Sequence, residues 1–270
     1  MKIQINNIYL AYDDHGVGLP VIFLHAFPLN RQMWAGELQA LLVEQRYRLI
    51  ALDWRGFGES EITSSVVKPV ISTMVMLADD LAGLMDRLGI EQAVLCGLSM
   101  GGYVAFAFAR KYPERVRGLV LADTRPGADP PEAKASREEV ALLAERQGTG
   151  AIADLQLPRL LADYTRQHHP VVERRVRQLI DSATPQGIAA AARGMAVRTD
   201  SSDLLATLAC PTLVLVGEED ALTPPQVARD YAAQIPGAQC ISIPHAGHLS
   251  NLEQPRAFIQ AVRQFLANLS

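Results

Sequence analysis

Residues 93–110 read AVLCGLSMGGYVAFAFAR, and this stretch decides the fold. The apolar run at its start is typical of a buried strand, and the apolar spacing after Gly102 is typical of a helix. The turn between them contains Gly97, Ser99 and Gly101 in the pattern G-x-S-x-G. A sharp turn from strand to helix strains the backbone at its centre, and the flanking glycines remove side-chain collisions. The stretch therefore predicts a strand–turn–helix unit that presents the Ser99 hydroxyl.

Short apolar runs and helix-like stretches alternate on both sides of this unit. Strand-like runs occupy residues 21–25, 47–53, 93–98, 116–123, 212–217 and 240–244. Helical spacing occurs over residues 33–45, 73–89, 103–112, 225–235 and 255–269. At the N-terminus, apolar and polar residues alternate around Asn6-Asn7, which predicts a hairpin. The alternation of strands and helices predicts the α/β class, with a mainly parallel sheet and helices on both of its faces.

Residues 125–203 interrupt this alternation, because they contain helix-like stretches but no strand-like run. A segment of this length is too long for a bare loop in a compact domain. We therefore predict a helical cap insertion, here called the cap, over the C-terminal edge of the sheet, with residues 1–124 and 204–270 as the core. The alternative is that these helices only complete the fold. The cap contains 11 basic and 11 acidic residues, so it is neutral overall.

The composition of the 270 residues excludes several classes of protein. A hydrophobic fraction of 49% excludes a disordered chain, and a net charge of −4 gives no reason to expect nucleic acid or an anionic membrane as a partner. The N-terminus lacks a signal-peptide pattern and no apolar run is long enough for a transmembrane helix, so we expect a cytoplasmic protein. The cysteines, Cys96, Cys210 and Cys240, are odd in number and lie in apolar surroundings, which predicts reduced core thiols.

A serine nucleophile needs a neighbouring base, usually a histidine that a carboxylate orients. Among the histidines, only His245 and His248 follow the last strand-like run. We predict His248 as the base, because it follows a glycine in the loop before the final helix, and His245 is the alternative. Asp220 lies just past the strand-like run 212–217 and is the predicted acid, with Glu219 as the alternative.

Acyl transfer to a serine develops a negative oxygen that two backbone N–H groups can stabilise. We predict that Met100, which follows the serine, and Phe27, in the loop after residues 21–25, form this oxyanion hole. His25 is predicted to brace that loop through hydrogen bonds to the backbone and to take no part in the chemistry.

Four residues are candidates for an apolar substrate pocket: Trp34, Met195, Leu222 and Leu249. The cap is neutral and contains Tyr164 as its only aromatic residue, which predicts a small and mostly uncharged substrate. No cluster of residues has the spacing of metal ligands, so neither a metal nor another cofactor is expected.

Five stretches, spread over nearly the whole chain, resemble motifs of the α/β-hydrolase superfamily. They are HAFPLN (25–30), DWRGFGES (53–60), GLSMGG (97–102), GEEDALTPP (217–225) and HAGHLSNLEQP (245–255). Within the superfamily the chain is similar to the group of small bacterial carboxylesterases, cofactor-free haloperoxidases (perhydrolases) and 3-oxoadipate enol-lactonases. The resemblance implies an eight-stranded sheet with a helical cap after the sixth strand. It also implies a triad of Ser99, Asp220 and His248, with the Phe27 and Met100 amides as the oxyanion hole.

One position departs from the family pattern, which usually has His-Gly where this chain has His25-Ala26. If that glycine needs a backbone conformation that is closed to alanine, the oxyanion loop must differ here. For the stretch DWRGFGES we predict structural roles, with Gly56 and Gly58 shaping a turn and Arg55 pairing with carboxylates.

The predicted function is a serine hydrolase that cleaves carboxylic esters of small, mostly uncharged substrates through an acyl-enzyme, that is, a carboxylesterase. Lactonase or perhydrolase activity on the same triad is the alternative, and a ligand-binding receptor of this fold with little turnover is a further one. The expected partner is a small-molecule ester or lactone, with no nucleic acid and no membrane. The sequence does not distinguish a monomer from a homodimer.

Overall fold

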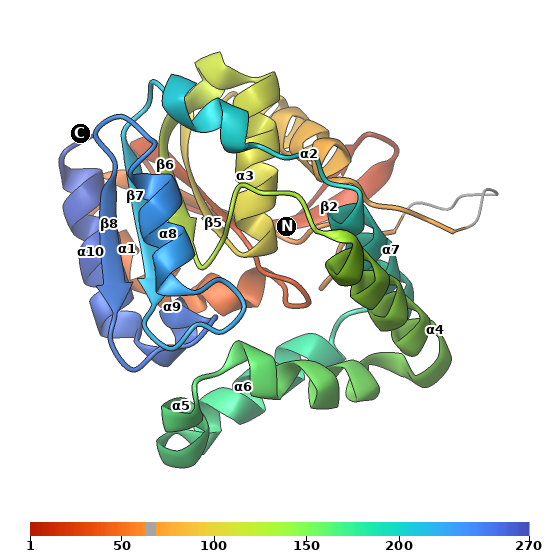
Figure 1. Cartoon of the computed structure of the whole chain (residues 1–270). Helices are drawn as coiled ribbons and strands as arrows, with labels where there is room; N and C mark the ends of the chain where they lie inside the picture. Colours follow the sequence, from red (N-terminus) through yellow and green to blue (C-terminus); the bar gives the residue numbers. More distant parts are fainter. Residues whose placement is uncertain (63–68, 270) are drawn as a thin grey trace.

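The computed structural model describes residues 1–62 and 69–269, and one sheet runs through its centre (Figure 1). Within these residues the sheet has eight strands in the order β1-β2-β4-β3-β5-β6-β7-β8. They are β1 (Lys2–Ile5), β2 (Ile8–Gly16), β3 (Leu19–Leu24), β4 (Tyr47–Leu52), β5 (Ala93–Leu98), β6 (Val116–Ala122), β7 (Thr212–Gly217) and β8 (Gln239–Ile243). All pairs among β3 to β8 are parallel, whereas β2 pairs antiparallel with β1 and β4. The predicted α/β class with a mostly parallel, eight-stranded sheet is confirmed.

The first two strands form the predicted hairpin. Asn6 and Asn7 make its turn, with φ of 45° and 64°. Asparagine tolerates this left-handed region better than most residues, which suits a two-residue hairpin turn. The hairpin extends the sheet beyond β4, at the end opposite to β8.

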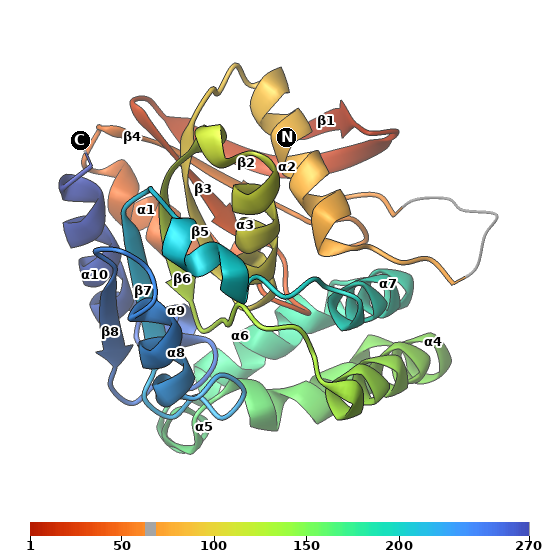
Figure 2. The same cartoon turned by 45° about the horizontal axis from the view of Figure 1, so that its top comes forward.

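Helices cover both faces of the sheet (Figure 2). On one face α2 (Met74–Arg87) packs against α3 (Met100–Lys111), and on the other α1 (Ala35–Leu42) packs against α10 (Pro255–Ala267). The further helices outside α4 to α7 are α8 (Pro225–Ala232), the short α9 (Ser250–Glu253), and the 3₁₀ helices η1 (Arg31–Trp34), η2 (Pro113–Arg115) and η3 (Ser202–Thr207). Every residue of β5 is buried, as expected for a central parallel strand that is covered on both sides.

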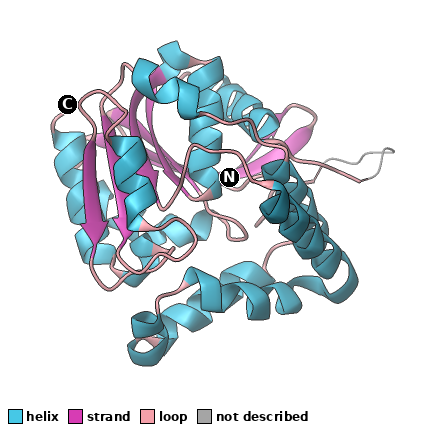
Figure 3. Ribbon diagram, viewed as in Figure 1, coloured by secondary structure: helices cyan, strands magenta, loops and turns pink. Residues whose placement is uncertain are grey.

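Four α-helices follow β6 in the sequence, ahead of η3 and β7, and all four fall within the cap. They are α4 (Pro131–Leu160), α5 (Asp163–His168), α6 (Pro170–Asp181) and α7 (Pro185–Ala196). Figures 1 and 3 show α4, α5 and α6 below the sheet, on the side toward which β7 and β8 point. The division of the chain into a core and a cap at residues 125–203 stays an interpretation of this arrangement. In the part of the chain that the structure describes, no helix combines the length and apolar character needed to cross a membrane.

The three cysteines are free, but they lie in different surroundings. Cys96 is buried in β5, as predicted, whereas Cys210 is half-buried and Cys240 is exposed on β8. The prediction of a core thiol is wrong for Cys240. Because β8 lies at the edge of the sheet, an apolar run there does not mean that both faces of the strand are covered.

A substitution at Gly101 tests the close contact between α3 and β3. A Cβ at this position would lie 2.1 Å from the backbone oxygen of Leu24, so the helix and the strand would have to move apart. We expect Gly101→Ala to lower the free energy of unfolding in denaturant titrations by about 1–3 kcal/mol. Gly150→Ala in α4 is the matched control, because nothing lies within 4 Å of its added Cβ. A Gly101→Ala protein as stable as this control would contradict the close contact.

Candidate active site

Ser99 lies at the junction of β5 and α3 in a strained conformation, with φ of 54° and ψ of −112°. Backbone contacts hold it there. A Cβ on Gly97 would lie 2.5 Å from the carbonyl carbon of Gly101, so glycine is required on this side of the turn. The structure therefore contains the strained strand–turn–helix unit that the motif predicted.

Ser99, His248 and Asp220 form one chain of hydrogen bonds. The hydroxyl oxygen of Ser99 lies 2.7 Å from Nε2 of His248, and Nδ1 of that ring lies 2.8 Å from Oδ2 of Asp220. Because a carboxylate only accepts, Nδ1 carries the proton, and Nε2 accepts from the serine hydroxyl. The structure brings these three candidates together and leaves the alternatives, Glu219 and His245, exposed and outside the chain of hydrogen bonds.

The charges around His248 favour its protonated form. Burial alone would lower the pKa of this imidazole, but the Asp220 carboxylate, through its charge and its hydrogen bond, and then Asp123 raise the pKa above its ordinary value. Burial would likewise raise the pKa of Asp220, but the charge and hydrogen bond of His248 and the hydrogen bonds of Thr223 hold it below its ordinary value. Asp220 therefore stays ionised beside the imidazole, and His248 is the group of the three that gains and loses the proton.

Two residues that the sequence analysis did not single out support this arrangement. The backbone N–H and the hydroxyl of Thr223 both donate to Asp220. Asp123, just after β6, accepts from the N–H of Gly217 at 2.8 Å and from the N–H and hydroxyl of Ser250. Burial and then the charge of Asp220 raise the pKa of Asp123 to about 8, so the negative charge beside His248 is held mainly on Asp220. A carboxylate at the end of the strand-like run 116–123 was the available signal for Asp123.

The loop that contains His248 is fastened to the cap. The N–H of His248 donates to the backbone oxygen of Leu160 at 3.0 Å. The carboxylate of Glu253 accepts from the N–H of Gly247 at 2.9 Å and from the N–H of Ala162 in the cap at 2.8 Å. Glu253 belongs to the stretch HAGHLSNLEQP, but its partner in the cap is distant in sequence and was not predictable from the motif. The position of His248 thus depends on the cap as well as on the core.

His25 braces the loop of residues 25–30, as predicted. Its Nδ1–H donates to the backbone oxygen of Ala26 at 2.9 Å, and its Nε2 accepts from the N–H of Trp54 at 3.0 Å. Burial is the main cause that lowers the pKa of His25 to about 3, so the ring stays neutral. A neutral, fully buried imidazole with both nitrogens bonded to backbone is a structural support.

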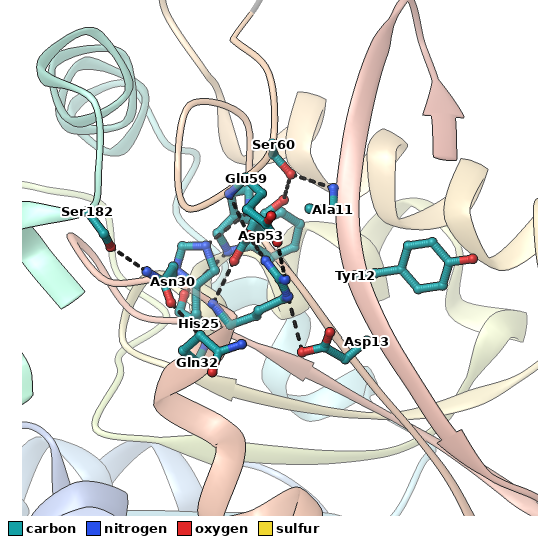
Figure 4. Close-up of polar contacts among 12 residues, drawn as sticks. Ala11, Tyr12, Asp13, His25, Asn30, Gln32, Asp53, Glu59, Ser60 and Ser182 are labelled. Carbon is teal, nitrogen blue, oxygen red and sulfur yellow. Dashed lines mark hydrogen bonds and ion pairs between the residues drawn. The ribbon is translucent and has the colours of Figure 1, made fainter. Parts of the chain in front are cut away.

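Asp53 fastens the far end of this loop (Figure 4). Its carboxylate accepts from the backbone N–H of Arg31 at 2.8 Å and from the N–H of Glu59 at 2.9 Å, and it forms an ion pair with the Arg31 guanidinium. Asn30 donates to the hydroxyl of Ser182 in the cap at 2.7 Å. The loop is therefore anchored to the core on one side and to the cap on the other.

The turn that follows Asp53 has the predicted structural roles. Gly56 and Gly58 adopt φ of 78° and 53°, in the left-handed region that favours glycine. The Arg55 guanidinium forms an ion pair with the buried Asp80. These residues do not line the cavity at Ser99.

Ala26, which stands where the resembling family usually has glycine, causes no backbone strain, because its φ is not positive. The loop therefore needs no rearrangement for an alanine at this position. Among the described residues, the N–H groups of Phe27 and Met100 donate no hydrogen bond, and Met100 is the first residue of α3, where a helix leaves its N–H groups unpaired. Both N–H groups are available to an incoming oxygen.

A cavity of about 290 Å³ lies between the core and the cap, and Ser99, His248 and Phe27 form part of its wall. Of the four predicted pocket residues, Met195 and Leu222 line this cavity. In the described residues, no group of three or more histidine, cysteine, aspartate or glutamate side chains could hold a metal ion.

The other two predicted pocket residues, Trp34 and Leu249, do not line the cavity, and the prediction is wrong for them. Both are fully buried in the core. The ring of Trp34 packs against Phe23 and Phe258, with ring centroids 5.3 and 6.0 Å away. Large apolar residues near a site are mostly core residues, and their spacing in the sequence does not show which way they face.

Three arginines that the sequence analysis missed also line the cavity: Arg125, Arg137 and Arg159. Asp129 is the one acidic side chain among the lining residues that the structure describes. We predicted a mostly uncharged substrate from the equal numbers of acidic and basic residues in the cap. In the wall of the cavity these numbers are unequal, because basic side chains outnumber acidic ones. Composition counts charges over a segment and does not show which of them face a site.

Comparisons with known proteins agree with this fold. The family model described as "alpha/beta hydrolase fold" matches residues 20–255. A thermophilic esterase from Thermogutta terrifontis, in a malate-bound structure, is 50% identical to this chain and has a TM-score of 0.94. The match covers 100% of this chain and 98% of the esterase chain. The enol-lactonase from Burkholderia xenovorans LB400 is 30% identical, with coverage of 99% and 100% and a TM-score of 0.88. A putative non-heme bromoperoxidase of Mycobacterium tuberculosis is 29% identical over 97% of this chain and 99% of its own.

The titration of His248 tests the electrostatics of the site without any substrate. We expect its pKa, measured by NMR of the imidazole nitrogens, to lie above 6.5, because the Asp220 carboxylate outweighs the effect of burial. Asp220→Asn removes that negative charge, so the pKa of His248 should fall. His25 is the internal control, since burial keeps it neutral down to about pH 3. A His248 pKa that is unchanged in Asp220→Asn would refute this assignment of charges.

Proposed function

Because the chain belongs to the α/β-hydrolase family, we propose that it hydrolyses carboxylic esters of small molecules, with Ser99 as the nucleophile, His248 as the base and Asp220 as the acid. The observation that carries the proposal is the continuous chain of hydrogen bonds from Ser99 Oγ through His248 to Asp220. A serine becomes an effective nucleophile when a neighbouring base takes its proton, and this base must be oriented by a third group. The wall of a cavity contains both Ser99 and His248, so a substrate can reach them.

Each residue has a defined task in the first half of the reaction. Oγ of Ser99 attacks the acyl carbon while its proton passes to Nε2 of His248. The N–H groups of Phe27 and Met100 stabilise the negative oxygen of the tetrahedral intermediate. Asp220 holds Nδ1–H and stabilises the imidazolium. His248 then gives its proton to the alcohol as the carbon–oxygen bond to the alcohol breaks, which leaves the acyl group on Ser99.

The second half repeats these steps with water. His248 takes a proton from water as the water oxygen attacks the acyl carbon, and the same two N–H groups stabilise the oxygen. The bond to Ser99 then breaks, the proton returns to Oγ, and the carboxylic acid leaves.

A lactone is the second candidate substrate, because its ring ester reacts by the same steps and leaves the alcohol attached to the acid. The similarity to an enol-lactonase of 30% identity over nearly the whole chain favours it. Esterase activity has the stronger support, since the esterase is 50% identical over the full length of this chain.

Ser99→Ala tests the nucleophile. We expect kcat/KM for short 4-nitrophenyl esters and for simple lactones to fall by about 10⁴-fold or more, because the acyl-enzyme can no longer form. Ser202→Ala, at an exposed serine of η3 that does not line the cavity, is the control and should retain the parent rate. Full activity of Ser99→Ala would refute the nucleophile. If the parent protein hydrolysed no ester or lactone of the panel, the proposed function would fail, and the alternative of a ligand-binding receptor would take its place.

A further inference from the structure

The charges of the cap are unevenly distributed around the cavity. Several acidic residues of the cap pair with arginines that do not line it. Glu138 and Glu145 both form ion pairs with Arg193, and Asp154 forms one with Arg177. These acidic side chains are therefore occupied elsewhere, and the cap is neutral only as a whole.

Within the cavity wall, one carboxylate is shared among several guanidinium groups. Oδ1 of Asp129 accepts from Arg125 at 2.9 Å and lies 2.8 Å from a guanidinium nitrogen of Arg198, and Oδ2 accepts from Arg137 at 3.1 Å. The Asp129 side chain is fully buried, and burial would raise its pKa, but Arg137 and Arg198 hold the pKa below its ordinary value. Asp129 thus carries a single negative charge against three positive ones. The cluster keeps an excess of positive charge.

Arg159 adds a further positive charge to the same wall. It lies in the last turn of α4, its side chain is exposed, and among the described residues it forms no ion pair or hydrogen bond. A guanidinium presents several N–H donors in one plane, and this arrangement matches the two oxygens of a carboxylate. Arg159 is therefore free to bind an anion that enters the cavity.

We propose that the substrate is a carboxylic ester or lactone that also carries a free carboxylate, and that Arg159, with Arg137 and Arg125, binds this carboxylate. The inference rests on the ester hydrolysis proposed above and names the substrate class of the same site. Met195 and Leu222 supply apolar surface for the carbon skeleton between the two carboxyl groups. A cavity of about 290 Å³ suits a small molecule of this kind.

A carboxylate bound here also changes the environment of His248. Burial lowers the pKa of His248 most strongly, and the charge of Arg137 lowers it further, whereas Asp220 and Asp123 raise it. A bound carboxylate offsets the charge of Arg137, so it should raise the pKa of His248. Succinate, the dicarboxylate product of a succinate half-ester, can therefore be used to measure binding without turnover.

The direct test compares two esters of the same shape. Monoethyl succinate carries a carboxylate where ethyl 4-methylpentanoate carries an isopropyl group. We expect kcat/KM to be higher for monoethyl succinate by about tenfold or more, because hydrogen bonds to a charged group are strong in a partly enclosed site. Arg159→Gln should reduce this ratio by about tenfold, and Arg159→Lys by less, because lysine keeps the charge but loses the planar pair of donors.

Arg146→Gln is the matched control. Arg146 lies in α4 on the other side of the kink at Gly148, is exposed, forms no ion pair among the described residues, and does not line the cavity. The variant Arg146→Gln should leave the ratio of kcat/KM between the two esters unchanged. This result separates binding at the cavity from the effect of net charge. If Ser99 hydrolyses both esters equally well, or if Arg159→Gln keeps the ratio of the parent, the carboxylate inference is wrong while the proposed hydrolysis stands.

If neither of these two esters is hydrolysed, the panel of 4-nitrophenyl esters and lactones still decides the proposed hydrolysis, and binding alone decides the anion site. Succinate should then raise the pKa of His248 in the parent and in Arg146→Gln, and do so only at higher concentration in Arg159→Gln. Equal concentration dependence in all three proteins would refute the anion site.

Discussion

The turn at Ser99 depends on backbone atoms that approach too closely for any side chain. Gly97 faces Gly101, and Gly101 faces the backbone oxygen of Leu24 in β3, at distances that leave no room for a Cβ. These contacts lock α3 onto two central, parallel strands and keep Ser99 at φ of 54°. The hydroxyl is thereby fixed relative to the carboxyl edge of the sheet, where the loops after β7 and β8 bring Asp220 and His248. Residues far apart in the sequence meet because parallel strands end at one edge.

Buried carboxylates hold the loops that meet around this turn. Asp53 fastens the loop of residues 25–30, Asp123 joins the ends of β6 and β7 to α9, and Glu253 ties the loop of His248 to the cap. A buried carboxyl group is costly unless several donors satisfy it, and each of these accepts two or more hydrogen bonds. The N–H and hydroxyl groups that offset this cost belong to the loops around the site, so the same hydrogen bonds also fix the positions of these loops relative to one another. Movement of the cap would therefore change the position of His248 as well as the shape of the cavity.

Local patterns were sufficient to predict the strand–turn–helix unit and the order of strands and helices along the chain. They also singled out Ser99, Asp220 and His248, which the fold brings into one chain of hydrogen bonds. Each of these depends on a turn, a strand end or a loop that neighbouring residues specify. Trp34 and Cys240 were assigned wrongly because their surroundings depend on what covers them, and this is set by segments distant in sequence. Arg159 was missed for the same reason. The charge count of the cap was correct, but which arginines the acidic residues of the cap pair with is a property of the folded chain.

The central claim is that Ser99 carries the acyl group between the two halves of the reaction. The most direct test is mass spectrometry of protein that is quenched with acid while it turns over excess 4-nitrophenyl butyrate. We predict a butyryl group on the peptide that contains Ser99, since an ester of Ser99 must form and break in each cycle. Turnover with a butyryl group on another residue, or with the group still present on Ser99→Ala, would contradict the account.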